Sequence, residues 1–320
     1  MKIIIPGGNG QVGRMLTRAF VREGHECLVF TRKPSHTPGT PGSREVPWDG
    51  KTLGPWTAEL EGADVVINLA GRSVDCRYHE RNLREMMASR VVSTRVIGQA
   101  IARVKNPPRV WLQASTATIY AHRFNAPNDE ETGLIGGHEP GVPALWARSI
   151  DIAHAWEAEL NAAATPRTRK VALRAAMVMS TVRLGVFHIL ARHSQLGFGR
   201  FGDGRQYVSW IHEHDFVSAV KFLIGREDLT GAFNLAAPDP LPNGDFLAAL
   251  RHQLGRRLAI PVPVWLLEFG TFFLRTETEL ILKSRRVVPT RLLESGFIFR
   301  YPDWLGAASE LATRWIADRK

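Results

Sequence analysis

A glycine cluster that begins at residue 7 constrains this chain more than any other feature. It directly follows the apolar run 2–5, and a helical pattern starts at its end. In such a strand–loop–helix unit, the first glycine permits a tight turn, the second lets the backbone approach a phosphate, and the third lets the helix pack closely on the strand. The helix N-terminus adds unpaired N–H groups and about half a positive charge. The loop predicts a pyrophosphate site, with a chance glycine cluster as the alternative. Its residues are Gly7, Gly8, Asn9, Gly10, Gln11, Val12 and Gly13.

Apolar β-type runs alternate with helical patterns through the first 180 residues. This order is typical of a parallel sheet that is covered by helices on both faces. The sequence therefore predicts an α/β protein with a Rossmann, doubly wound parallel sheet. The expected strands are 2–5, 26–31, 45–47, 65–69, 110–114 and 171–174, and the expected helices are 13–23, 84–104 and 144–164.

Two cations follow the second expected strand, in the order Thr31, Arg32, Lys33. Enzymes that bind NAD commonly have an Asp or Glu there, which accepts hydrogen bonds from the ribose, whereas NADP enzymes have a cation beside the 2′-phosphate. Arg32 can hold a phosphate through two hydrogen bonds, and Lys33 adds a point charge. The pattern predicts NADP(H) as cofactor. Two solvated surface cations are the alternative.

Small residues at the end of the expected strand 65–69 indicate where the dinucleotide would cross the sheet edge. Leu69, Ala70 and Gly71 are the predicted cofactor wall.

The regular alternation ends near residue 180. Residues 1–180 are predicted to form the NADP-binding Rossmann domain, and residues 181–320 a smaller, partly interleaved C-terminal region that binds substrate. In the second region, 245–253, 264–273 and 277–283 have helical patterns, and 297–299 is expected to be a short strand.

Charge and hydropathy exclude several other classes of protein. The net charge of +10 is dispersed along the chain, which favours a solvated surface over a nucleic-acid groove. The longest apolar stretches, 65–70 and 262–267, are far shorter than the roughly 20 residues of a membrane span. No secretory signal is recognisable at the start, so we expect a cytoplasmic protein without membrane partners. The His residues have no ligand spacing with Cys or carboxylates, so no metal site is expected.

With these motifs, the whole chain resembles an extended short-chain dehydrogenase/reductase. Its later motifs resemble the epimerase-like family, with a C-terminal epimerase-associated domain, whose members are regarded as NADP-dependent nucleoside-diphosphate-sugar epimerases. The segment 202–215 is the most specific part of the resemblance. Besides the glycine loop and Arg32-Lys33, the residues that carry it are Trp48-Asp49, 66–71, Ser89-Arg90, 204–207, 210–212, Asp215, Val288-Pro289, Arg291-Leu292 and Gly296-Phe297.

The resemblance implies an NADP(H) cofactor and adds Trp48 to the predicted cofactor-binding residues. It also implies a catalytic Tyr with a Lys four residues later, which lowers the pKa of the Tyr. None of the four Tyr residues has a Lys at that distance. Arg148 and Ile152 occupy the places of the Tyr and the Lys. The family itself tends to lack an intact pair.

Residues 114–120 resemble the segment of the superfamily that supplies a substrate-binding hydroxyl. The resemblance places Thr116 in that role and makes Tyr120 a candidate replacement for the missing acid. A polar strand end that is satisfied by its neighbours is the alternative for Thr116, and a pocket wall is the alternative for Tyr120.

Four downstream residues form the predicted substrate wall: Arg205, Gln206, Trp210 and His212. Arg and Gln can bind a carboxylate or a phosphate, Trp offers a stacking face, and His titrates near neutral pH. A structural role is the alternative for His212. Asp215 is expected to anchor the helix that follows it.

The sequence thus predicts an NADP(H)-dependent oxidoreductase or epimerase that acts on a small polar substrate, of which nucleotide sugars are one class. A non-catalytic NADP(H)-binding redox sensor or scaffold is the alternative, because the Tyr–Lys pair is missing. The resemblance also leaves open a homodimer through the two long helices that flank the central strands.

Overall fold

A computed structural model describes residues 1–34, 39–137, 139–183, 185–267 and 279–319. Seven strands form its central sheet in the order β11-β6-β5-β4-β1-β2-β3, and all neighbouring pairs are parallel. These strands are β1 (Lys2–Pro6), β2 (Glu26–Thr31), β3 (Arg44–Pro47), β4 (Val65–Asn68), β5 (Val110–Thr116), β6 (Arg169–Ala175) and β11 (Gly231–Leu235).

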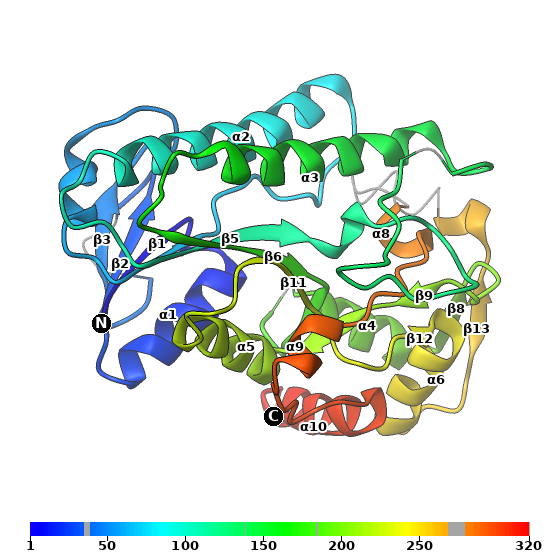
Figure 1. The fold of residues 1–320 in the computed structure, drawn as a ribbon. Helices are drawn as coiled ribbons and strands as arrows, with labels where there is room; N and C mark the ends of the chain where they lie inside the picture. The colour runs from blue at the N-terminus through cyan, green and yellow to red at the C-terminus, as the bar shows by residue number, and fades with distance from the viewer. Residues whose placement is uncertain (35–38, 138, 184, 268–278, 320) are drawn as a thin grey trace.

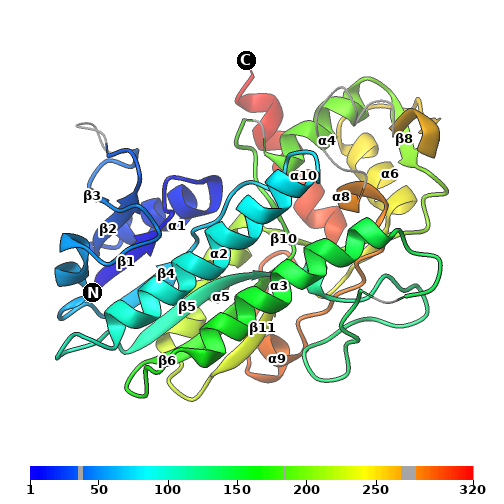
Figure 2. The same ribbon diagram turned by 90° about the horizontal axis from the view of Figure 1, so that it is seen from above.

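Helices cover both faces of this sheet (Figure 1). On one face, α2 (Glu80–Ile101) and α3 (Ala144–Ala162) run side by side (Figure 2), and on the other lie α1 (Gln11–Arg22) and α5 (Glu213–Gly225). Successive side chains of β1 point to opposite faces, so Ile3 packs with Phe20 of α1, whereas Ile4 packs in the core that contains Val96 of α2. The predicted doubly wound α/β fold is confirmed.

A second hydrophobic core lies beyond the carboxyl ends of the strands (Figure 2), where Phe246 stacks on Trp304 with ring centroids 3.8 Å apart. Its helices include α4 (Val186–Gln195), α6 (Asn243–Gln253) and α10 (Trp304–Ala317). Its two-stranded sheets are β7 (Met177–Met179) with β10 (Trp210–His212), β8 (Phe198–Phe201) with β13 (Ile260–Val262), and β9 (Tyr207–Val208) with β12 (Leu241–Pro242). The shorter helices are η1 (Pro55–Leu60), η2 (Ala117–Ile119), α8 (Glu279–Leu282) and α9 (Thr290–Glu294).

The strand expected at residues 297–299 is wrong. Phe297 and Phe299 are buried and Ile298 is 88% exposed, so the alternation of a strand is present, but the segment pairs with no neighbour among the described residues. The adjacent sheet edge, β11, is covered by side chains instead: Arg291 donates to the carbonyls of Thr230 and Ala232. An edge that is covered in this way offers no ladder to a further strand.

Three helices expected in the C-terminal region have different outcomes. The pattern 245–253 corresponds to α6, and 277–283 corresponds to the short helix α8. The expected helix 264–273 is helical at 264–267, and its remaining residues, 268–273, lie outside the described residues. The strand β11 had not been predicted, although it lies beside β6 in the central sheet.

Candidate functional site

The sheet order changes direction at β1 and β4, and the loops that follow these two strands meet there. Gly7 has a φ of +76°, and a Cβ on it would lie 2.8 Å from the Cα of Ala70. A Cβ on Gly13 would lie 2.4 Å from the Cα of Gly8. Packing therefore requires glycine at both ends of the loop. In open α/β sheets, ligands bind at such a switch point.

Gly10 differs from these two glycines, because packing does not explain it. A Cβ there would contact only the carbonyl oxygen of Gly7, at an ordinary 3.6 Å. Gly10 is also the N-cap residue of α1, and no side chain caps that helix N-terminus. Its backbone amides and the positive end of the helix dipole suit a phosphate.

The cations that follow β2 lie at the same edge of the sheet. Arg32 and Lys33 are exposed, and the Lys33 amide donates to the hydroxyl of Thr31 at 3.3 Å. Since parallel strands β1 and β2 are neighbours, their carboxyl ends place these cations beside the glycine loop. The arrangement offers positive charge to a second phosphate group.

Some predicted cofactor residues hold the loop rather than face outward. The side-chain amide of Asn9 donates to Glu45 of β3 at 3.2 Å. Val12 packs against the core, and the Gln11 side chain lies against Gly185, the N-cap residue of α4. Backbone groups therefore dominate the surface that residues 7–13 present.

The other side of the crevice follows β4. Leu69 donates its amide to the Pro6 carbonyl at 2.9 Å, and Ala70 donates to the side chain of Asn68 at 3.1 Å, so this segment is fixed beside the glycine loop. Gly71 is exposed and faces the guanidinium of Arg90.

Trp48 is only 5% exposed, and its ring contacts those of Phe30 and Trp56 in the core. Its side chain therefore supports the sheet edge and has little surface with which to touch a cofactor.

Thr116 is half-buried at the carboxyl end of β5, and its hydroxyl oxygen accepts a hydrogen bond from the Thr118 amide at 3.1 Å. This bond uses the oxygen as an acceptor, so the hydroxyl hydrogen stays available to an oxygen of a substrate.

Tyr120 does not have the environment of a catalytic acid. It is 2% exposed, it donates its hydroxyl hydrogen to Asn234 at 3.0 Å, and its oxygen accepts from Arg174 at 2.8 Å. Burial raises the pKa of Tyr120. The structure therefore corrects the candidate role of Tyr120 as the acid. Its side chain belongs to a buried structural network, in which Arg174 also forms two hydrogen bonds to Glu157.

The residues at the places of the missing Tyr and Lys point elsewhere. Arg148 is exposed and pairs with Glu80 at 3.2 Å, which joins α3 to α2. Ile152 is buried against Tyr78, Leu83 and Met86.

The residues of the predicted substrate wall do not line a common surface. Trp210 is fully buried and donates its indole N–H to the Asp239 carbonyl at 3.1 Å. Gln206 is buried and donates to the carbonyl of Phe201 at 3.0 Å. Arg205 is exposed and pairs with Asp203. The cause of the error is that the density of polar and aromatic residues in 202–215 serves internal hydrogen bonding.

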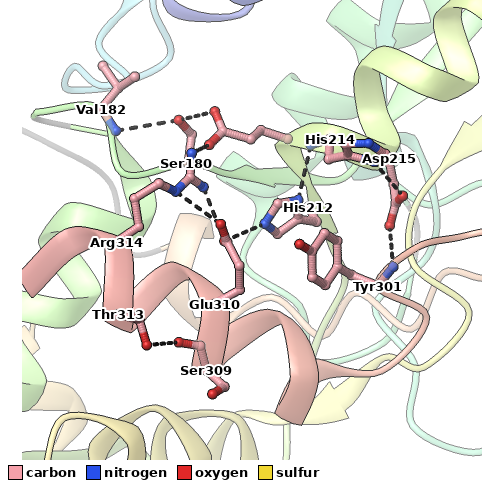
Figure 3. Close-up of polar contacts among 11 residues, drawn as sticks. Ser180, Val182, His212, His214, Asp215, Tyr301, Ser309, Glu310, Thr313 and Arg314 are labelled. Atoms are coloured by element: carbon pink, nitrogen blue, oxygen red, sulfur yellow. Dashed lines mark hydrogen bonds and ion pairs between the residues drawn. The ribbon is translucent and has the colours of Figure 1, made fainter. Parts of the chain in front are cut away.

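His212 is also an internal residue, as Figure 3 shows. Its Nδ1 accepts from the His214 amide at 3.0 Å, which caps α5, and its Nε2 lies 3.0 Å from Glu310 of α10. Because Nδ1 is an acceptor, Nε2 carries the proton. Burial lowers the pKa of His212. The structural alternative for His212 therefore fits better than a place in a substrate wall.

Asp215 anchors a distant segment. Its carboxylate accepts hydrogen bonds from the amides of Arg300 at 2.9 Å and Tyr301 at 2.8 Å. Asp215, which was expected to anchor α5, thus fixes the backbone at residues 300 and 301, and His212 caps the helix instead.

A buried charged cluster beside Thr118 was missed by the sequence analysis. The ammonium of Lys283 donates to the Thr118 carbonyl at 2.9 Å and lies 3.6 Å from Glu279, which accepts from Ser149 at 2.6 Å. Arg285 donates to the Thr118 hydroxyl at 3.3 Å. Burial lowers the pKa of Lys283 to about 8. Its only sign in the sequence was the run 283–286, which contains three cations, and the dispersed basic residues had been assigned to a solvated surface.

Two further observations concern membrane-spanning helices and groups of metal-ligating side chains in the described part of the chain. No helix there is long and apolar enough to span a membrane, and no three His, Cys, Asp or Glu side chains group as metal ligands do.

Comparison with known proteins places this geometry in context. Residues 3–140 match the NAD dependent epimerase/dehydratase family, and residues 262–311 match a domain of unknown function, DUF1731. The chain is 30% identical to the cattle (Bos taurus) epimerase family protein SDR39U1 over 96% of this chain and 98% of that protein.

Two solved structures are similar over nearly the whole chain. The crystal structure of human epimerase family protein SDR39U1 (isoform 2) with NADPH has a TM-score of 0.84 at 27% identity and covers 98% of this chain and 99% of that one. A nucleoside-diphosphate sugar epimerase from Corynebacterium glutamicum has a TM-score of 0.74 at 26% identity, over 98% of this chain and 58% of that one.

Proposed function

The chain belongs to the NAD dependent epimerase/dehydratase family, and on that premise we propose that it is an NADP(H)-dependent oxidoreductase of the epimerase type. Its substrate is a small polar molecule of the nucleotide-sugar class. The human relative with NADPH and the Corynebacterium sugar epimerase support the cofactor and the substrate class respectively.

The observation that carries the cofactor assignment is the pairing of an uncapped helix with two cations. The backbone amides at the start of α1 suit the pyrophosphate, and Arg32 and Lys33 suit the 2′-phosphate. Leu69, Ala70 and Gly71 form the opposite side of the crevice. When bound, the nicotinamide supplies or accepts a hydride.

On the substrate side, Thr116 is the proposed hydrogen-bond donor to a substrate oxygen. Its bond with the Thr118 amide fixes the oxygen and leaves the hydroxyl hydrogen to donate. Tyr120 and His212 take no part in proton transfer, because their polar atoms are already engaged inside the fold. Solvent water at the crevice is then the proton source.

A non-catalytic NADP(H)-binding sensor is the second candidate. One specific observation favours it: the places of the Tyr and the Lys hold Arg148 and Ile152, and Tyr120, the candidate replacement, is buried. To separate the two, the purified protein is incubated with NADP+ or NADPH and a panel of nucleoside-diphosphate sugars and carbonyl compounds. Absorbance near ~340 nm reports net oxidation or reduction, and chromatography of the products detects epimerisation, which returns its hydride and leaves that absorbance unchanged. Cofactor binding without any turnover supports the sensor.

The cofactor assignment is tested with R32A/K33A. We expect NADPH to bind about 10- to 100-fold more weakly, because hydrogen bonds to a charged phosphate are lost, while NADH affinity changes little. Both side chains are exposed, so the free energy of unfolding should change by less than about 0.5 kcal/mol.

The matched control is R256A/R257A, which removes two adjacent exposed cations from the other region. It should leave both affinities unchanged. An equal loss of NADPH and NADH affinity in R32A/K33A would show that these cations do not read the 2′-phosphate.

A further inference from the structure

The C-terminal helix α10 is joined by polar contacts to a short segment between β7 and α4, of which the structure describes residues 180–183 and 185. We propose that Arg314, Glu213 and Ser180 are positioning residues that hold this segment against the glycine loop, residues 7–13, and so set the affinity for NADP(H). The inference rests on the proposed function. It gives the C-terminal part of the chain a role in cofactor binding.

The connection starts at Arg314 on α10. Its guanidinium forms an ion pair with Glu213, the first residue of α5, and donates to Glu310 at 3.2 Å. Glu310 also receives the Nε2–H of the buried His212, so the carboxylate and guanidinium are held from two sides (Figure 3). Two contacts therefore join α10 to the start of α5: the Arg314–Glu213 ion pair and the hydrogen bond from His212 to Glu310. Charge-assisted contacts of this kind fix distance and direction.

The connection continues from Glu213 into the segment after β7. The second carboxylate oxygen of Glu213 accepts from the Ser180 hydroxyl at 2.6 Å. The Ser180 oxygen in turn accepts from the Val182 amide at 3.4 Å (Figure 3). Ser180 is only 1% exposed, so its hydroxyl cannot exchange these partners for water.

The end of this segment lies against the glycine loop. Gly185 donates its amide to the Val182 carbonyl at 2.9 Å. A Cβ on Gly185 would lie 2.8 Å from the side-chain nitrogen of Gln11, the residue that begins α1. The glycine therefore allows the segment to rest directly on the loop whose amides suit the pyrophosphate.

These contacts predict the direction of the effect. A segment that is already fixed beside the loop loses less conformational freedom when a cofactor binds, so affinity is higher. Breaking the connection at α10 leaves every residue of the glycine loop in place. Affinity should nevertheless fall.

The test uses the full-length protein and NADPH, whose fluorescence reports binding. R314M keeps the apolar stem of the side chain and removes the fork; S180A removes one hydroxyl. We expect NADPH to bind about tenfold more weakly to R314M and about threefold more weakly to S180A, as is usual for residues coupled to a site. R314K should recover part of the loss, because it restores the charge without the planar fork.

The matched control is R95M. Arg95 likewise pairs with a glutamate of another helix, Glu159 of α3, here through two hydrogen bonds of 2.9 and 2.7 Å, but on the opposite face of the sheet. Its NADPH affinity should equal that of the wild type. Thermal unfolding of all variants separates a general loss of stability from a specific loss of affinity.

Hydrogen exchange of the amides of Val182 and Gly185 is measured on the cofactor-free protein. Faster exchange in R314M and S180A, together with weaker NADPH binding, supports the proposal. Unchanged exchange, or faster exchange with an NADPH affinity within twofold of the wild type, overturns it. If the wild type does not bind NADPH, the proposed function fails at that step; the exchange arm still shows whether α10 holds the segment.

Discussion

The dinucleotide crevice and the C-terminal region of this protein are held together by different kinds of interaction. In the crevice, consecutive residues 7–13 and the tail of β4 contact each other mainly through backbone, and glycine is required where a Cβ would collide. In the C-terminal region, buried side chains join residues far apart in the chain: His212 to Glu310, and Thr118 to Lys283, at separations of 98 and 165 residues.

The two regions should therefore be sensitive to different kinds of substitution. In the crevice, the cost of a substitution depends on whether the new side chain fits. In the C-terminal networks, removal of one partner leaves a charge or a polar atom buried without compensation. The regions should therefore respond differently to substitution, and three experiments can break or sharpen that contrast.

The largest effect is expected in the buried charged cluster. K283M removes a fully buried ammonium and leaves the carboxylate of Glu279, which is 1% exposed, without that partner. We expect the free energy of unfolding to fall by about 3 kcal/mol in urea titrations. The double variant E279Q/K283M should lose less, because no buried carboxylate remains.

The control for this cluster is K221M, which breaks an ion pair with Glu23 in which both side chains are partly exposed. Its cost should be below about 1 kcal/mol. A K283M protein as stable as K221M would show that the buried pair contributes nothing, and the proposed contrast between the regions would fail.

A smaller effect is expected in the crevice, where two glycines give opposite results. G13A places a Cβ 2.4 Å from the Cα of Gly8 and should lower the free energy of unfolding by about 2 kcal/mol. G10A places a Cβ 3.6 Å from its nearest neighbour, so it should cost less than about 1 kcal/mol yet weaken NADPH at least about tenfold. Unfolding and NADPH titrations of both variants decide this. A G10A protein with normal affinity would remove the argument that this glycine serves a ligand.

The smallest effect is a pH dependence at His212. Burial lowers the pKa of His212 below its unfolded value near 6.5, so the folded protein favours the neutral ring. The stability that the neutral ring contributes is complete above pH ~6.5 and is lost as pH falls through the lower, folded-state pKa. The charged groups that act on the ring are Glu310, Glu213 and Asp215. The ring of Tyr301 lies against it, tilted by 32°, with centroids 3.9 Å apart.

Thermal unfolding between roughly pH 8 and pH 5, on both sides of the pKa of unfolded histidine, tests this with H212Q, which keeps one acceptor and one donor. The wild type should lose more stability on acidification than H212Q, since glutamine does not titrate. Parallel curves for the two proteins would show that His212 is not the titrating group.

The candidate site was predictable to the extent that backbone forms it. The glycine loop, the cations after β2 and the small residues after β4 were identified because each lies next to a strand end that hydrophobic patterning locates. The places of Gln206, Trp210 and His212 could not be predicted in this way. A sequence does not show whether such side chains face a ligand or a buried carbonyl. Their orientation depends on partners such as Asp239 and Glu310, which come later in the chain.

The α/β order of the elements, the doubly wound sheet and the position of the glycine loop could be read from the amino-acid sequence, because they follow from local periodicity and from the φ values that glycine allows. Only the tertiary structure decided that Tyr120 and His212 are buried, that Lys283 reaches Thr118, and that α10 is joined to the segment beside Gln11. Those outcomes depend on contacts between distant residues, and the burial that gives a polar side chain its role exists only once the chain has folded.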